Sequence, residues 1–433
     1  MDFELQHQRP RPDRVRWVLA GMLLLASSLN YVDRQALSIL APTMQQELHI
    51  SDGQYGFIVQ AFLICYTVMY LLSGRIVDRI SARFSEAAFL IGWSVAGLLT
   101  AFVTGFRSLL FVRSLLGASE PGNFTAASKI VSEWFPAEER GTAVGLYSMG
   151  GTIGAAIAAP LVAWLTIRHG WRSAFVVTGI AGFLLALFWL LIYRAPPQCA
   201  TSSSEREMLQ PDVLSSNAQP VLETSRSSSP LRFLFTSKAF WGIVLARMIT
   251  DPVWYFYLFW FPKYLQEGRG MSLAAIGKLL WIIFVAADLG SLAGGLASSR
   301  RIRANGSTVR TRVRIMAFAA IVPCFTFVIP SLPGYIFPLT AACCAAFAHM
   351  AWMTNATTLP IDIFPAELIG SVQGMVGAFS SMAAVISTSF ISLAVTHLSY
   401  APVFYVASFL YPLALIVLMQ IPGATLKGEQ ISI

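Results

Sequence analysis

The chain has 433 residues, of which 56% are hydrophobic and 12% are charged. An ordinary soluble domain carries about 25% charged residues, so the composition excludes a soluble globular protein and favours a chain that lies in lipid. Lys and Arg outnumber Asp and Glu by 30 to 22, which gives a formal net charge of +8. Because the basic residues lie mostly between long apolar segments, this excess indicates membrane topology rather than nucleic-acid binding.

Twelve apolar segments are long enough to cross a bilayer, which requires about 20 residues in a helix. They form two groups of six, separated by a polar gap: 15–38, 53–74, 84–105, 108–129, 142–165 and 173–193, then 239–262, 273–297, 313–331, 334–356, 369–391 and 401–421. The pattern predicts an all-α membrane protein with twelve transmembrane helices in two pseudo-symmetric six-helix bundles.

The expected domain organisation has a tail at each end and a linker between the two bundles. The tails are residues 1–14 and 422–433, the two bundles are 15–193 and 238–421, and the linker is 194–237. The linker is rich in Ser, Pro, Gln and Glu and cannot bury a core, so we expect a flexible segment with at most one surface helix. The first apolar segment is too long for a signal peptide and no cleavage site follows it, so it is expected to stay as the first span.

The basic residues are distributed unevenly over the two sides of the predicted bundle. With the N-terminus in the cytoplasm, the segments on that side hold 21 Lys and Arg and those on the other side hold 6. The positive-inside rule therefore predicts that both termini and the linker are cytoplasmic. We expect a multi-pass protein of a bacterial inner membrane.

Two short patterns recur in the two halves. The segment 133–142, after the fourth span, resembles 362–371, after the tenth, since both contain Phe-Pro-Ala-Glu in the same register. The segment 74–79, after the second span, resembles 295–300, at the end of the eighth. Repeats that are six spans apart keep the same orientation, so the halves are expected to be related by an axis along the membrane normal.

Charged residues inside the spans are the strongest functional signal, because a charge at the bilayer centre costs roughly 2.5–3.5 kcal/mol on insertion scales. Asp33 and Arg34 are adjacent in the first span, and Arg113 and Glu120 lie in the fourth. Their spacing places Arg113 and Glu120 on one helix face, about 10 Å apart. Each is therefore expected to face another helix, with Asp33 and Arg34 as the candidate partners.

These four charges divide into an anion site and proton sites. A guanidinium group can hold a carboxylate with two hydrogen bonds, so Arg34 is the expected anion ligand. Burial favours a neutral acid and a nearby arginine reverses this preference, so Asp33 and Glu120 are expected to couple protons, with Arg113 competing for them. The alternative is that the four residues form a static structural network.

Other polar residues in the spans complete the candidate site. The predicted substrate-binding set, besides Arg34, is Tyr31, Tyr66, Arg113, Trp352 and Asn355. Arg247 and Asp251 are four residues apart, so they either neutralise each other or contact substrate. Asp288 is expected to bond to neighbouring backbone, with proton coupling as the alternative. For His349, packing with one hydrogen bond is favoured over proton relay.

Further positions are expected to have structural or gating roles. A gate that latches a closed state is expected at the ends of spans two and three, from Gly74, Asp78, Arg79 and Arg83. The glycines of span five favour close helix packing first and a gating bend second. The five cysteines show no metal-ligand spacing and are interpreted as small apolar side chains. No cofactor and no metal are expected.

Several stretches resemble a known family. The loop 74–83 resembles the signature loop of the major facilitator superfamily, with Ser81 at the position of its usual second Gly. Six further stretches resemble the anion:cation symporter family, and in particular its hexuronate (sugar acid) transporter branch. They are 30–34, 117–124, 133–136, 251–260, 286–291 and 359–365. This resemblance covers nearly all of the chain except the linker and termini. It implies the major facilitator fold, proton coupling at Asp33 and Glu120, and an anion held by Arg34.

Two departures from the family pattern concern the choice of substrate. In span five, Ser148-Met149-Gly150 replaces the usual Asn-Ser-Gly, and in span ten Met350 and Met353 replace the common Gln and Ser. This less polar lining leaves room for a carboxylate that is more apolar than a sugar acid.

The sequence therefore predicts a proton-coupled symporter that imports an organic anion by alternating access, with galacturonate or glucuronate as the leading substrates. Its expected partners are the anion, protons and the lipid bilayer, with no nucleic acid, and the chain is expected to act as a monomer. The alternatives are another carboxylate (an aldonate, an aldarate or an aromatic acid), anion exchange or export, and more remotely a membrane-embedded enzyme or a sensor. No convergent nucleophile–base pair supports an enzyme, and the linker is too short for a signalling domain.

Overall fold

The computed structural model describes residues 12–193 and 230–421, and within these ranges the chain is helical without β-strands. Most of the expected N-terminal tail and linker, and the C-terminal tail, lie outside the described residues, at 1–11, 194–229 and 422–433.

The first half makes six helical passes. In chain order they are α1 (Pro12–Leu48), α2 (Asp52–Arg79), α3 (Ala82–Thr100), α4 (Phe106–Ser119) with α5 (Gly122–Trp134), α6 (Ala137–His169) and α7 (Arg172–Ile192). The fourth pass is interrupted between α4 and α5, where Pro121 has no N–H to donate to the helix. The interruption places Glu120 at a helix break inside the bundle.

The second half also makes six passes, after the short helix α10 (Pro230–Thr236) in the predicted linker. They are α11 (Lys238–Tyr255) with η2 (Phe256–Trp260), α12 (Phe261–Lys263) and η3 (Tyr264–Gly268), α13 (Leu273–Leu279) with α14 (Trp281–Asn305), α15 (Thr308–Cys324) with η4 (Thr326–Ser331), α16 (Ile336–Ile363), η5 (Ala366–Leu368) with α17 (Ile369–His397), and α18 (Ala401–Met419). The first pass of this half contains π-helical turns, η2 and η3.

The twelve predicted spans are confirmed as helical passes. Ten helices of the described chain are long and apolar enough to cross a membrane on their own. The other two passes are the fourth and the seventh, which are divided by the break at Glu120 and by the π-helical turns. An irregular helix is tolerated at membrane depth where it is buried in protein or lines a cavity.

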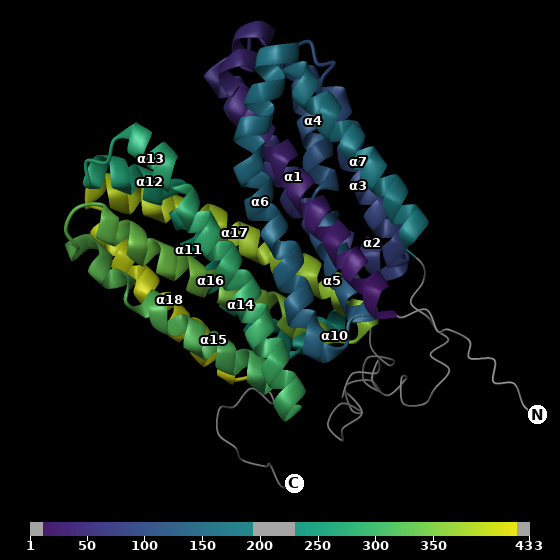
Figure 1. The fold of residues 1–433 in the computed structure, drawn as a ribbon, viewed down its shortest axis with the longest axis vertical. Helices are drawn as coiled ribbons and strands as arrows, with labels where there is room; N and C mark the ends of the chain where they lie inside the picture. Colours follow the sequence, from purple (N-terminus) through teal and green to yellow (C-terminus); the bar gives the residue numbers. More distant parts are fainter. Residues whose placement is uncertain (1–11, 194–229, 422–433) are drawn as a thin grey trace, which may run out of the picture.

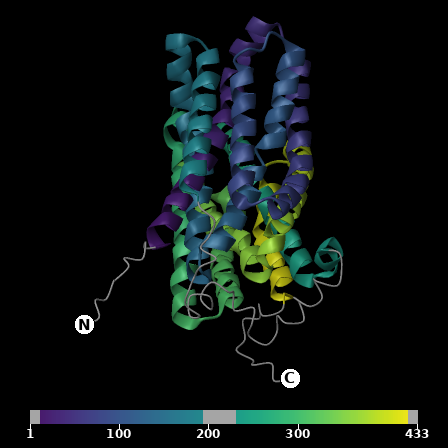
Figure 2. The ribbon, with the colours of Figure 1, turned by 90° about the vertical axis from the view of Figure 1, so that its right-hand side faces the viewer.

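The two halves meet at one end of the molecule and diverge at the other (Figure 1). Across the boundary, α2 packs against α17 and α6 packs against α14. In the view turned by 90°, the first half forms the upper part of the molecule, and the second half lies below it (Figure 2). In each pair, the second pass of one half packs against the fifth pass of the other half. This exchange is expected for two related halves.

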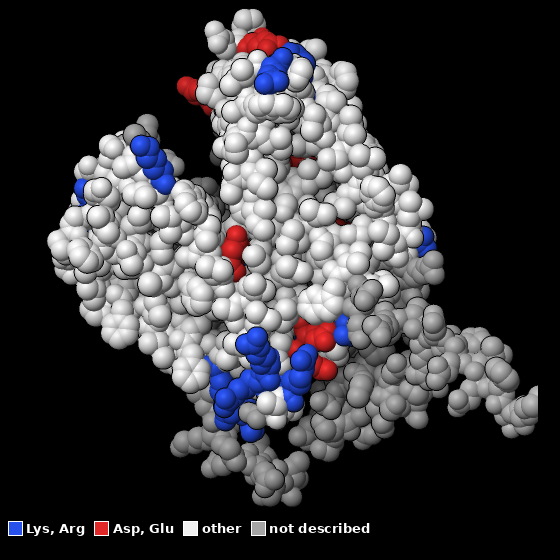
Figure 3. All heavy atoms as spheres, in the orientation of Figure 1, with Lys and Arg blue, Asp and Glu red and all other residues white. Residues whose placement is uncertain are grey.

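Basic side chains gather at the end where the halves meet (Figure 3). They include the exposed Arg75 and Arg79 at the end of α2, and Arg300, Arg301 and Arg303 at the end of α14. We name this end the basic end. The opposite end, where a notch separates the two halves (Figure 3), is named the open end.

Candidate functional site

A cavity of ≈ 210 Å³ lies between the two halves. Its walls combine aromatic, hydroxyl and charged side chains from both halves: Tyr31, Arg34, Tyr66, Tyr70, Tyr147, Arg247, Asp251, Trp254, His349, Gln373 and Ser380. A concave site with a few convergent polar groups is the usual form of a small-molecule site. Three of the predicted substrate-binding residues, Tyr31, Arg34 and Tyr66, are in this wall.

Arg34 reaches the cavity wall while it is paired with Glu120. Its Nε and Nη2 atoms donate to Oε2 of Glu120 at 3.1 and 2.6 Å. The Arg34 side chain is 28% exposed, whereas that of Glu120 is fully buried. The structure thus joins the charges of the first and fourth spans across helices, and leaves part of the guanidinium accessible from the cavity.

Aromatic rings hold this guanidinium in position. Its central carbon lies 4.7 Å from the ring centroid of Tyr66, 5.1 Å from that of Tyr31 and 5.6 Å from that of Phe62. Such contacts attract a cation to the ring face and are stronger where water is excluded. Tyr31 itself fits against α6 because a side chain at Gly151 would meet its ring.

Glu120 uses only one of its two carboxyl oxygens. Oε2 accepts both bonds from Arg34, and the buried Oε1 has no hydrogen-bond partner among the described residues. The free oxygen leaves this carboxyl group with a place for a proton.

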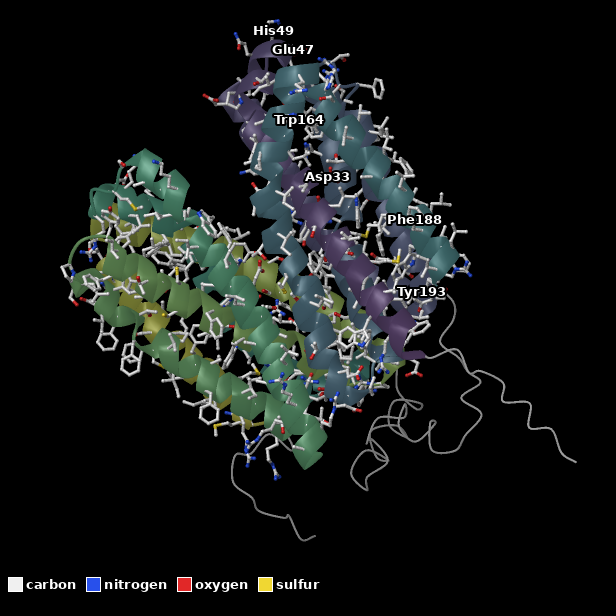
Figure 4. The ribbon with its side chains drawn as sticks, in the orientation of Figure 1. Asp33, Glu47, His49, Trp164, Phe188 and Tyr193 are labelled. Carbon is white, nitrogen blue, oxygen red and sulfur yellow. The ribbon has the colours of Figure 1, made fainter. Side chains whose placement is uncertain are left out.

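Asp33 lies within the first half, away from the notch (Figure 4). Nη1 of Arg113 donates to the backbone carbonyl of Asp33 at 3.5 Å, and its guanidinium lies 5.3 Å from the ring of Phe175. No ion pair joins Arg113 to Asp33 or Glu120 in the part of the chain that the structure describes. Competition of Arg113 for the two acids stays a prediction.

Three predicted substrate contacts require correction, because Arg113, Trp352 and Asn355 are buried outside the cavity wall. Asn355 donates to the backbone carbonyls of Gly294 and Ala351, at 3.2 and 2.9 Å. Trp352 packs edge-on against Tyr411, with ring centroids 5.5 Å apart. The turn of α16 directs these two side chains into the second half.

Arg247 and Asp251 line the cavity and also pair with each other, as their spacing allows. Nε of Arg247 donates to both carboxylate oxygens of Asp251 at 3.0 Å, and Nη2 donates to Oδ2 at 2.9 Å. Nη1 donates to the hydroxyl of Thr357 at 3.2 Å. Ser380 donates to the same carboxylate. The second half therefore presents a guanidinium that is already held by a carboxylate.

Asp288 does not bond to neighbouring backbone as expected. Its carboxylate accepts a hydrogen bond from the hydroxyl of Thr152 on α6, because α14 packs directly on that helix. His349 lines the cavity and also packs in the second half. It stacks on Trp254 with ring centroids 5.6 Å apart and makes a hydrogen bond through Nδ1 to the hydroxyl of Tyr411.

The halves are in backbone contact at the basic end. The carboxylate of Asp78 accepts bonds from the N–H groups of Gly370 and Ser371 at 2.8 and 2.7 Å, in the first turn of α17. Unpaired N–H groups at a helix start favour an anion. Gly74 permits this contact because a Cβ atom there would meet the backbone of Gly370.

Two predicted gate residues do not take part in this contact, and the gate prediction is corrected for them. Arg79 is exposed, and Arg83 donates to the carbonyl of Leu190 within the first half.

Sequence reasoning missed several lining residues. They include Tyr70, Tyr147, Thr357, Gln373 and Ser380. Tyr70 lies one turn after Tyr66, so its inclusion was accessible from helix periodicity. Gln373 is an amide within an apolar span and was a signal of the same kind. The hydroxyl residues carry no such signal, because Ser and Thr are common in helix packing.

Three of the positions that depart from the family pattern face the cavity. Ser148, Met350 and Met353 are part of its wall, whereas Met149 and Gly150 are not. The apolar methionines therefore lie where they can influence the choice of substrate.

Comparison with known proteins agrees with the fold. A family model of the Major Facilitator Superfamily matches residues 23–388. The chain is 29% identical to the hexuronate transporter of Escherichia coli (strain K12) over 394 residues, which is 90% of each chain. It is 34% identical to the galacturonate transporter of Dickeya chrysanthemi over 282 residues, covering 65% of this chain and 81% of that one.

A solved structure shows the same fold at low sequence identity. The proton:xylose symporter XylE, bound to 6-bromo-6-deoxy-D-glucose, superposes with a TM-score of 0.72 at 16% identity. The match covers 93% of this chain and 95% of that one.

Proposed function

This chain belongs to the Major Facilitator Superfamily, and on that premise we propose that it imports a sugar acid together with protons. The leading substrate is a hexuronate such as galacturonate or glucuronate. The names of two relatives, a hexuronate transporter and a galacturonate transporter, support this substrate class. The multi-pass fold and the cavity between its halves support transport by alternating access.

The Arg34–Glu120 ion pair at the cavity wall is the observation that carries the proposal. A substrate carboxylate that enters the cavity can take the hydrogen bonds of Arg34 from Glu120. The fully buried Glu120 would then be an unpaired charge, which costs several kcal/mol. Glu120 avoids this cost by binding a proton. Anion and proton therefore bind together, which is the coupling that symport requires.

Asp33 serves as a second proton site in this scheme. It is buried one residue from Arg34, and Arg113 bonds to its backbone carbonyl. A change in the position of Arg34 moves the same turn of α1, so the environment of Asp33 depends on the state of the substrate site.

The basic end is proposed to face the cytoplasm, with both termini on that side of a bacterial inner membrane. In this orientation the described conformation is closed to the cytoplasm by the contacts of Asp78 and Gly74 with α17. The notch at the open end then faces outward (Figure 3). The cavity is formed within one chain, which supports a monomer as the transporting unit.

Uptake of labelled galacturonate by purified protein in liposomes tests the proposal. We expect accumulation that follows an imposed pH gradient, acidic outside. Uptake that ignores the gradient would exclude symport. Glu120→Gln should abolish accumulation and retain counterflow exchange, because a neutral amide cannot exchange a proton.

Arg34→Lys tests the anion site. The substitution keeps the charge and loses the bidentate fork, so the KM should rise by about tenfold or more. Arg172→Lys is the matched control, because Arg172 also pairs with a glutamate, Glu47, beside an aromatic ring, but does not line the cavity. An equal loss in both variants would contradict the assignment.

A second substrate class is supported by the presence of Arg247 in the cavity wall. Guanidinium groups from both halves suit an aldarate, which carries a carboxylate at each end. Competition of galactarate against labelled galacturonate separates the two. Stronger inhibition by galactarate, abolished by Arg247→Lys, would favour the aldarate.

A further inference from the structure

Glu86 of α3 is a carboxyl group that the substrate site does not use. It is fully buried, and neither of its carboxyl oxygens has a hydrogen-bond partner among the described residues. Buried side-chain polar atoms in proteins are nearly always bonded, to protein or to ordered water. The sequence expectations did not include Glu86, although it lies inside the third predicted span.

Glu86 faces the same side of α3 as the residue that contacts Asp33. A Cβ atom at Gly97 would lie 3.9 Å from Oδ1 of Asp33. Gly97 and Glu86 are eleven residues apart, or about 16 Å along the axis of α3. Eleven residues make three turns with a remainder of about 20°, so the two positions point in nearly the same direction. Glu86 therefore lies on the face of α3 that is directed toward Asp33 of α1, about three turns closer to the basic end.

Further unpartnered polar atoms lie between these two acids. Both amide atoms of Asn30, the side-chain oxygen of Asn123 and the indole N–H of Trp93 are buried without a partner among the described residues. Asn30 is one turn from Asp33 on α1, and Ser27 is one turn beyond Asn30. The amide nitrogen of Asn123 donates to the hydroxyl of Ser27 at 3.2 Å. Trp93 is seven residues from Glu86, so it shares its face. The helices that carry them, α1, α3 and α5, pack against one another.

The register of α3 against α4 and α5 orders these groups along the bundle. A Cβ atom at Gly92 would meet Ser119, and one at Gly122 would meet the ring of Phe89. The helices are therefore antiparallel, and Asn123 lies between the levels of Trp93 and Glu86. Beyond Glu86, the exposed Ser81 is five residues away, or about 8 Å along the axis.

The charged groups of the surrounding helices are committed to other partners. Lys129 of α5 donates to the carbonyls of Val77 and Asp78, and the carboxylate of Glu133 accepts a bond from Tyr193. Arg83, on α3 itself, donates to the carbonyl of Leu190 on α7.

The remaining charged neighbours, on α1, α4 and α2, make their contacts away from Glu86. Arg34 pairs with Glu120, and Arg113 lies at the carbonyl of Asp33. Asp78 bonds to the first turn of α17. Glu86 therefore has no ion partner in the described chain. A solitary carboxyl group that carries its proton can donate and accept hydrogen bonds at the same time.

We propose that Glu86 relays protons along a hydrated route inside the first half, from Asp33 past Asn30, Trp93 and Asn123 to the cytoplasm. This inference rests on the proposed proton symport. Water molecules bonded to the unpartnered atoms connect the two acids. A proton leaves the carboxyl of Asp33 for the adjacent water and passes along the chain. Glu86 accepts a proton on one oxygen and releases the proton of its other oxygen to water at the basic end, so only O–H bonds are exchanged. The route bypasses the substrate cavity, which is closed at that end.

Transport by the full chain in liposomes tests the relay. Glu86→Gln keeps the size and polarity and removes the exchangeable carboxyl proton. It should slow galacturonate uptake driven by a pH gradient by about tenfold or more. Counterflow exchange, which requires no proton release, should stay within about twofold of the wild type, and Glu86→Asp should restore part of the driven rate. Ser94→Ala is the control, because that buried α3 hydroxyl already bonds to the carbonyl of Leu90.

Hydroxyl-radical labelling tests the water directly. Trp93 should be labelled although it is fully buried. Trp164 lies toward the open end of the first half (Figure 4) and is the positive control, because it is 51% exposed. Trp189, which is 1% exposed and donates to the carbonyl of Arg83, is the dry control.

The outcomes separate the relay from the symport. Wild-type uptake that ignores the pH gradient refutes the proposed function itself. Wild-type coupling with an unchanged driven rate in Glu86→Gln refutes the relay alone, as does labelling of Trp93 no greater than that of Trp189. Equal loss of driven uptake and counterflow in Glu86→Gln also overturns the relay, since it indicates a structural role.

Discussion

Asp78 and Ser299 occupy equivalent positions in the two halves. Each accepts a hydrogen bond from a backbone N–H group of the opposite half, near the start of a helix, and in both cases the donor is a Ser or Thr residue. Asp78 accepts from Ser371 at 2.7 Å, and Ser299 accepts from Thr142 at 3.3 Å. The two acceptors hold the same place in the repeated segments 74–79 and 295–300, and Thr142 and Ser371 are the last members of the other repeat. The two repeats therefore contact each other across the boundary between the halves.

Glycines follow the same symmetry. A Cβ atom at Gly74 would meet the backbone of Gly370, and one at Gly295 would meet the backbone of Gly141. The two contacts close the basic end from both sides of the pseudo-symmetry axis. The carboxylate of Asp78 accompanies the first contact, and the hydroxyl of Ser299 accompanies the second. Arg312 also donates to the carbonyl of Ala137 across the second contact, and Arg140 pairs with Asp362 there. Asp78 and Ser299 should therefore contribute unequally to closure of the basic end.

Asp78→Ala should open the basic end more than Ser299→Ala does. Each hydrogen bond to a charged group contributes about 1.5–3 kcal/mol, against about 1 kcal/mol for a neutral pair. Asp78 accepts two such bonds from α17, and Ser299 accepts two from Thr142, through its N–H and its hydroxyl. The conformational equilibrium should therefore shift by at least about a hundredfold in the first variant and by about thirtyfold in the second. Electron spin resonance distances between labels at positions 79 and 367, in a cysteine-free background, measure this shift. Equal shifts would contradict the asymmetry.

Gly74→Ala should favour the conformation that is open at the basic end, because the added methyl group would collide with the backbone of Gly370. The same pair of labels should move apart. Gly21→Ala is the control: a Cβ atom at Gly21 on α1 has nothing within 4 Å, so its only expected effect is a gain in helix stability of about 1 kcal/mol. Unchanged label distances in Gly74→Ala would show that the backbone contact does not limit opening.

Asp362→Asn should destabilise the protein by about 3–5 kcal/mol, because it leaves two buried arginines without their anion. Arg140 and Arg312, which are 5% and 0% exposed at the side chain, both pair with Asp362. Thermal unfolding in detergent measures the loss. Glu267→Ala removes the exposed pair with Lys263 and should cost about 0–1 kcal/mol. A similar small loss in Asp362→Asn would argue against the buried network.

Replacing Met350 by Gln and Met353 by Ser should improve transport of a polyhydroxylated anion. Both methionines line the cavity, and each new hydrogen bond to a hydroxyl group contributes about 0.5–1.5 kcal/mol. The KM for galacturonate should fall by about tenfold for the double variant. The KM for an aromatic acid, measured in the same liposomes, should rise. A parallel change for both substrates would show that the methionines do not select between them.

Much of the candidate site follows from the chemistry of single residues. Charges inside apolar spans are costly, so Asp33, Arg34 and Glu120 stand out without any structure. Glu86 has the same signature near the end of its span, where a charge is easily read as the start of a polar loop. Trp352 and Asn355 stand out in the sequence as polar groups in an apolar span, and the structure places them in helix packing. Their direction depends on which neighbours surround α16, which residue type does not reveal.

The sequence by itself determined the twelve passes, their division into two halves and the repeats that relate them. Those features depend on local hydrophobicity and on spacing along the chain, because the bilayer sets the length and polarity of each span. Only the tertiary structure decided that Arg34 pairs with Glu120, that Asp78 bonds to α17, and which faces line the cavity. These relationships join residues that are 86 and 293 positions apart, so they depend on how helices pack rather than on the properties of either segment.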